Sequence, residues 1–124
     1  MQQTDQQMNQ QMSEGTSPED VVVLVTTVDD EAQVRSMARR LVEQQLAACV
    51  HITRIDSIYH WAGAVQEHRE WQLSCKTMAA RATALQQAIL ALHPYEVPML
   101  YRLPVAWAHQ PYGQWVAQTC SGEV

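Results

Sequence analysis

AACVHITRIDSIYHWAGAVQEHREWQLSCKT, residues 47–77, is the stretch that decides the fold of this 124-residue chain. Both of its halves are rich in β-branched and aromatic side chains, which is typical of strands. Gly63 can adopt the positive φ that a two-residue hairpin turn requires, so we predict a long hairpin that turns at Ala62 and Gly63. Pairing of Trp61 with Ala64 across this turn sets the register of both strands.

The register sorts the side chains of the two strands, residues 47–61 and 64–77, into two faces. One face is apolar and is expected to be covered by helices; it holds Val50, Ile52, Ile58, Val65, Trp71, Leu73 and Cys75. The other face is mostly polar, with two large aromatic side chains near the hairpin tip; it holds Cys49, His51, Thr53, Ser57, Tyr59, Trp61, Glu70, Gln72, Ser74 and Lys76. A face of this mixed character is expected to meet another subunit.

The segments on either side of the hairpin predict the remaining elements. The β-branched run VVVLVTTV (21–28) predicts a strand that is central or covered on both faces. Asp29 and Asp30 offer an N-cap for a helix that ends near Gln45. After the hairpin we predict a helix over 78–92, a strand over 99–105, and a short helix over 110–119 that buries Tyr112, Trp115 and Val116.

The order of these elements is β-α-β-β-α-β, followed by a short C-terminal helix. It predicts an α+β fold, a ferredoxin-like sandwich with a long central β-hairpin. Residues 1–19 are rich in Gln and lack an apolar period, so we expect a disordered tail there. Residues 20–120 are expected to form one domain, and residues 121–124 a disordered C-terminus.

Composition and charge exclude several classes of partner. The formal net charge is −5, and the chain has one lysine and seven scattered arginines, which argues against nucleic acid and anionic membranes. No apolar run approaches the roughly 20 residues that cross a bilayer, and the N-terminus lacks the features of a signal peptide. Cys49, Cys75 and Cys120 have no C-x-x-C spacing and fit reduced thiols. A cytoplasmic protein is therefore expected.

Cys49 and His51 are the strongest candidate metal ligands among the residues of the hairpin. They lie two residues apart on one strand face, where a thiolate and an imidazole could share a soft ion such as Cu(I). A small buried thiol beside a ring that is solvated or buried by another subunit is the simpler and preferred explanation of the pair. Glu70 and Lys76 on the same face could form a functional charge pair or an ordinary salt bridge. Trp61, at the hairpin tip, is predicted to anchor an interface.

HPYEVP (93–98) follows the predicted second helix and has two readings. Pro94 disfavours a helical conformation for His93, so it ends the helix, and Pro98 leads into the last strand. In the first reading this mechanical task is the only one, with His93 bonded to backbone at the helix end. In the second reading His93 also binds a ligand, because residues in loops on a rigid scaffold are often functional.

No motif predicts an enzyme. The chain has neither HEXXH, a nucleophile elbow nor a phosphate-binding glycine loop. GAVQEHR (63–69) resembles the loop of acylphosphatases only superficially, because it lies in the central hairpin and Glu67 stands where that loop has its second glycine. We therefore expect a protein without catalytic activity.

A broader resemblance links the chain to a known family. ACVHI (48–52), SIYHWAG (57–63), the segment from Glu70 to Thr77 and HPYEVP resemble the CutA family of divalent-cation tolerance proteins, in the same order and spacing over residues 21 to about 117. The resemblance implies a ferredoxin-like subunit, a tight homotrimer whose sheets face the threefold axis, and a shape similar to that of the PII signalling trimers.

The same resemblance implies a role in tolerance of copper and other divalent cations. Some members bind copper through a first-strand cysteine and two adjacent histidines, whereas here these positions hold Val25, Leu92 and His93, so that only His93 matches. Metal binding is therefore expected to be weak, with His93, Cys49 and His51 as candidate ligands and copper or another divalent cation as the only candidate cofactor. The alternative is a PII-like regulator that senses a small molecule in clefts between subunits, lined by Trp61, Glu70, Lys76, Tyr95 and Glu96.

Overall fold

The computed structural model describes residues 17–121 and confirms the α+β fold. Its strands and helices are β1 (Val21–Val28), α2 (Glu31–Glu43), β2 (Cys49–Trp61), β3 (Ala64–Met78), α3 (Ala82–Leu92), β4 (Leu100–Pro104) and α4 (Gln110–Cys120). A short 3₁₀ turn, Ala79–Arg81, precedes α3, so the helix predicted over 78–92 begins later than expected. As predicted, the Asp30 carboxylate caps α2 by accepting the Gln33 backbone N–H at 2.8 Å.

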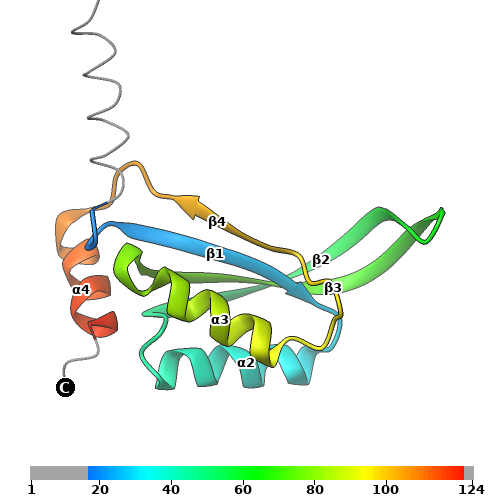
Figure 1. The fold of residues 1–124 in the computed structure, drawn as a ribbon, viewed down its shortest axis with the longest axis horizontal. Helices are drawn as coiled ribbons and strands as arrows, with labels where there is room; N and C mark the ends of the chain where they lie inside the picture. The colour runs from blue at the N-terminus through cyan, green and yellow to red at the C-terminus, as the bar shows by residue number, and fades with distance from the viewer. Residues whose placement is uncertain (1–16, 122–124) are drawn as a thin grey trace, which may run out of the picture.

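The four strands form one antiparallel sheet in the order β2-β3-β1-β4. Helices α2 and α3 lie on one face of the sheet, and α4 lies at the end where β1 begins (Figure 1). The β2–β3 pairing runs without a bulge from Trp61 opposite Ala64 to Cys49 opposite Lys76, which confirms the predicted register. Both turn residues have positive φ, 53° at Ala62 and 78° at Gly63.

The main core lies between the sheet and the two helices α2 and α3. Leu24 and Leu73 from the sheet are fully buried with Leu41 and Leu85 from the helices. Cys75 belongs to this core, and burial raises the pKa of its thiol to about 12. Because it is buried and its pKa is raised, Cys75 is a packing residue rather than a reactive thiol. Cys49 points to the opposite face, as the register requires.

Two predictions about burial are wrong. Ile58 and Val65 were expected in the core, but they are 68% and 71% exposed because the hairpin projects beyond the helices (Figure 1). In α4, Val116 is buried as expected, but Tyr112 and Trp115 are 37% and 44% exposed. The helix instead packs its smaller residues, Val116 and Cys120, against Val21, Ala48 and Met78.

The predicted tail falls mostly outside the described residues. Residues 1–16 and 122–124 are not described, whereas residues 17–19, which we assigned to the tail, form a turn that is bonded to the domain. The Ala80 backbone N–H donates to the Pro18 carbonyl at 3.0 Å, and the Ala79 N–H donates to the Asp20 carbonyl at 2.8 Å. Over residues 17–121, no helix has both the length and the apolarity needed to cross a membrane.

Candidate functional site

The sheet face opposite α2 and α3 carries most of the predicted site residues. Alternation along the paired strands places Cys49, His51, Ser74 and Lys76 on this face, which we call the open face. The same alternation adds exposed large side chains from the hairpin and from β4, namely Tyr59, Trp61, Tyr101 and Leu103. Among residues 17–121 of one chain, no helix covers the middle of this face, and α4 packs only at its end, against Val21 and Met78.

Lys76 contacts His51 on the open face, near the end of the sheet where α4 packs. The Lys76 Nζ lies 2.8 Å from the His51 Nδ1 and 3.3 Å from the Ser74 carbonyl oxygen. An ammonium group can only donate, so His51 accepts at Nδ1 and keeps its hydrogen on Nε2. His51 is thus a neutral imidazole beside a fixed positive charge, which works against the binding of a second cation there.

Cys49 lies next to α4. Its Sγ is 3.9 Å from the Tyr112 hydroxyl oxygen. Burial, and then the neighbouring thiol, raise the pKa of the Tyr112 phenol, so Tyr112 remains neutral and can donate to the sulfur. Cys49 and His51 are separated by about 7 Å along β2. Their side chains share a face, as predicted, but Cys49 contacts Tyr112 and His51 contacts Lys76.

His93 joins the end of α3 to β1. Its Nε2 lies 2.9 Å from the Thr27 carbonyl oxygen and 3.1 Å from the Thr26 hydroxyl, whose own hydrogen is donated to the Met99 carbonyl. Both partners accept, so Nε2 carries the hydrogen, and Nδ1 accepts the Tyr95 backbone N–H at 3.1 Å. Both ring nitrogens of the neutral imidazole are therefore occupied, and burial lowers the pKa of the ring.

The extended conformation of His93 explains how the chain reaches this position. Its φ of −73° and ψ of 134° are those preferred before proline, so Pro94 ends α3 as predicted. The confirmed mechanical role and the occupied nitrogens support the first reading of HPYEVP. A metal ion at His93 would have to displace either Thr27 or the Tyr95 backbone N–H.

Tyr95 and Glu70 form the second contact of this loop. The Tyr95 hydroxyl donates to a Glu70 carboxylate oxygen at 2.9 Å, and Glu70 is only 8% exposed. Burial, followed by the bond to Glu70, raises the pKa of the Tyr95 phenol above its usual value. The Tyr95 ring also meets the His93 ring edge-on, with centroids 4.8 Å apart. Within the described part of the chain, Glu70 is thus a buried carboxylate that accepts a hydrogen bond from the Tyr95 phenol.

The structure does not gather the predicted site residues into one cluster within a chain. Glu70 and Lys76, six residues apart on β3, are separated by about 20 Å and form no ion pair. Trp61 lies at the hairpin tip, and Glu96 is exposed in the loop after α3. Among residues 17–121, no three His, Cys, Asp or Glu side chains are close enough to hold a metal ion.

Sequence reasoning missed three residues of these networks. Thr26 and Thr27 accept hydrogen bonds from His93, and Tyr112 contacts Cys49. The signal for Thr26 was present, because a hydroxyl in a buried apolar strand needs a hydrogen-bond partner. Thr27 accepts through its backbone carbonyl, which no side-chain pattern indicates. Tyr112 was expected in the core, and its phenol oxygen made that position doubtful for the same reason.

Comparison with known proteins identifies relatives over the described domain. The family of the CutA1 divalent ion tolerance protein matches residues 22–119. The divalent-cation tolerance protein CutA of Thermus thermophilus is 41% identical over 97 residues, which cover 77% of this chain and 94% of that protein. Human protein CutA is 39% identical over 105 residues, which cover 84% of this chain but only 59% of the human protein.

Solved structures give the same assignment. CutA from Synechococcus elongatus superimposes with a TM-score of 0.79 at 37% identity, covering 82% of this chain and 91% of that one. CutA from Xylella fastidiosa superimposes with the same TM-score at 31% identity. The element order, the long hairpin and the extent of both similarities agree, and the chain belongs to the CutA1 divalent ion tolerance family.

Proposed function

We propose that this chain forms a homotrimer through its open face and that the trimer acts, without catalysis, in the response to divalent cations, copper among them. The observation that carries the proposal is the open face itself: Tyr59, Trp61, Tyr101 and Leu103 are each more than 40% exposed in one chain. An exposed apolar surface of this kind marks an interaction site. The choice of divalent cations as the ligand rests on relatives that are named divalent-cation tolerance proteins.

Metal binding in this proposal uses ligands from different chains. Cys49 with His51 is the preferred pair, because both nitrogens of His93 are already bonded. For a metal ion to bind His51, the Lys76 ammonium must first release Nδ1. Thiolate and imidazole suit a soft ion such as Cu(I). All three cysteines are free, which fits a reducing compartment, so we place the trimer in the cytoplasm.

Two measurements test this proposal. Light scattering on the eluting protein should give three times the chain mass of 14.1 kDa. Calorimetric titration with Cu(I), Cu(II) and Zn(II) should show saturable binding that Cys49→Ser and His51→Gln weaken. Lys76→Met should tighten it by removing the competing ammonium, and His109→Gln, at an exposed histidine, serves as the matched control. A monomer, or no binding tighter than millimolar, would contradict the proposal.

A second candidate is a PII-like regulator that senses a small molecule between subunits. The Glu70–Tyr95 pair favours it, because a buried carboxylate and phenol could recognise a polar ligand. A relative from Synechococcus elongatus, 37% identical, has been solved in complex with a Bis-Tris molecule. In the trimer, clefts would combine Trp61, Glu70, Lys76, Tyr95 and Glu96 from neighbouring chains. A thermal-shift screen of nucleotides, organic acids and amino acids tests it, since a specific ligand raises the melting temperature.

A further inference from the structure

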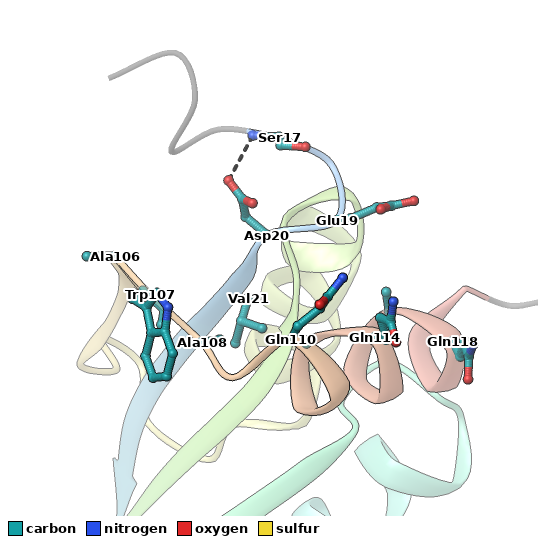
Figure 2. Close-up of a pocket in the computed structure, with 13 residues that line it drawn as sticks. Ser17, Glu19, Asp20, Val21, Ala106, Trp107, Ala108, Gln110, Gln114 and Gln118 are labelled. Atoms are coloured by element: carbon teal, nitrogen blue, oxygen red, sulfur yellow. Dashed lines mark hydrogen bonds between the residues drawn. The ribbon is translucent and has the colours of Figure 1, made fainter. Parts of the chain in front are cut away.

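A groove lies along α4, bounded by the segment that joins β4 to α4 and by the turn before β1 (Figure 2). Its volume is about 550 Å³, within the range of small-molecule sites. Val21 lies at its floor and Trp107 forms one wall. Glu19 and Asp20 stand at its rim, and α4 supplies the opposite wall. We call this the α4 groove; none of the residues discussed as metal or cleft candidates lines it.

The α4 groove is negatively charged. Its lining includes the carboxylates of Glu19 and Asp20 and contains no Lys, Arg or His. The N-terminus of α4, at Gln110, adds only about half a positive charge to this surface. The sum favours a cation, and the formal charge of −5 for the whole chain adds to the attraction.

The acidic rim is held in place before any ligand binds. The Asp20 carboxylate accepts the Ser17 backbone N–H at 3.1 Å. Two backbone bonds, from Ala79 to Asp20 and from Ala80 to Pro18, fix the turn to the start of the α3 region. A preformed rim reduces the ordering cost of binding. Glu19 makes no contribution to these bonds through its side chain, which is free to meet a ligand.

The two walls suit a ligand with an apolar chain and several donors. The Trp107 side chain is 78% exposed, and an indole face attracts organic cations. On the opposite wall, Gln110, Gln114 and Gln118 recur every four residues, so their Cα atoms follow one another at about 6 Å along α4. Amide oxygens at that spacing can each accept a hydrogen bond from an ammonium group.

We propose that the α4 groove binds a linear organic polyamine, with its ammonium groups on the acidic rim and the glutamine wall and its alkyl chain against Trp107. This inference goes beyond the proposed function and does not rest on it. A metal ion fits the groove poorly, because Ca²⁺ takes six to eight oxygen ligands and Mg²⁺ six. Within residues 17–121, no three His, Cys, Asp or Glu side chains are grouped closely enough to hold a metal ion.

The test is a calorimetric titration of the full chain with spermidine, with 1,8-octanediol as a neutral probe and MgCl₂ at matched ionic strength. We expect saturable binding of spermidine only. Trp107→Leu should weaken it about 3- to 30-fold, as the loss of a cation–π contact predicts. Gln114→Lys should weaken it and Gln114→Glu should strengthen it, because these substitutions add opposite charges at one exposed position of the same wall.

Matched controls lie outside the groove. Trp115→Leu changes an exposed indole on α4 that does not line the groove, and Glu31→Gln removes an exposed carboxylate on α2. Neither substitution should change spermidine affinity. Absence of saturable binding below about 1 mM overturns the proposal. So does equal binding of the diol or of Mg²⁺, equal affinity in both Gln114 variants, or a loss of affinity in the control variants that matches the loss in Trp107→Leu.

Discussion

His93 holds two parts of the chain together that are 66 residues apart. Its imidazole connects Thr27 in β1 with the backbone of Tyr95 in the loop after α3. Glutamine can supply a donor and an acceptor but cannot match the ring geometry, so His93→Gln should destabilise the protein by about 1–2 kcal/mol at pH 8. Urea denaturation at one protein concentration measures this, because assembly would make stability depend on concentration.

The contribution of His93 should also depend on pH. Burial lowers its pKa below the ordinary 6.5, against opposing effects of the Thr27 bond and the Glu70 and Asp29 carboxylates. Protonation therefore favours the unfolded chain. The contribution is complete above pH 6.5 and declines as pH falls through the lower folded-state pKa. The stability difference between wild type and His93→Gln should shrink from pH 8 to pH 5; a constant difference would contradict the assigned neutral ring.

Glu70 and Tyr95 form a coupled pair that a double-mutant cycle can separate. Tyr95→Phe removes the phenol that donates to the Glu70 carboxylate, a residue that is 8% exposed, and should cost about 1–3 kcal/mol. Glu70→Gln should cost less, because an amide oxygen still accepts from the phenol. The double variant should be less destabilised than the sum of the two, as measured by urea denaturation. Strict additivity would show that the 2.9 Å contact contributes nothing.

The hairpin turn holds a non-glycine residue in a strained backbone conformation. Ala62 has a φ of 53°, in the left-handed region, where a β-carbon costs about 1–2 kcal/mol. Asn-Gly is the preferred pair for a two-residue turn with two positive φ angles. Ala62→Asn should therefore stabilise the protein by about 0.5–1 kcal/mol. Gly63→Ala should destabilise it through backbone strain alone, since no atom lies within 4 Å of an added β-carbon.

Thermal melts of these two variants measure both effects. Ala64→Asn, next to the turn but in β3, is the control, and it should not stabilise the protein. If Ala62→Asn had no effect while Gly63→Ala was neutral, the turn would not hold the φ angles described.

Helix α4 shows how far periodicity can predict an element. Its bounds followed from the sequence to within a residue, but its buried side did not. Size suggested that Tyr112 and Trp115 are buried, whereas Val116 and Cys120 pack against β1 and β3. Periodicity shows which positions share a side, and the space available under the helix decides which side faces inward. That space depends on Val21 and Met78, which no local pattern in α4 can reveal.

At the scale of the whole molecule, the fold was more predictable than the site. The hairpin register followed from one turn because no bulge interrupts the β2–β3 pairing. The tautomer of His93 could not follow, since it depends on Thr26 and Thr27 in a strand that the sequence does not place beside it. The exposure of Ile58 and Val65 could not be predicted either, because alternation assigns a side chain to a face but does not say where the covering helices end.

The projecting end of the hairpin provides the last prediction. Ile58 and Val65 are 68% and 71% exposed in one chain, so replacing both with lysine costs a monomer little. In a trimer that covers the arm, the same change buries two charges at an interface, which is strongly unfavourable. Light scattering should therefore show Ile58→Lys/Val65→Lys as a smaller assembly than wild type. Val42→Lys, at a 38% exposed site on α2, should keep the wild-type mass. An unchanged mass in the double variant would mean that the arm stays in solvent and that assembly, if any, uses the open face near β4 alone.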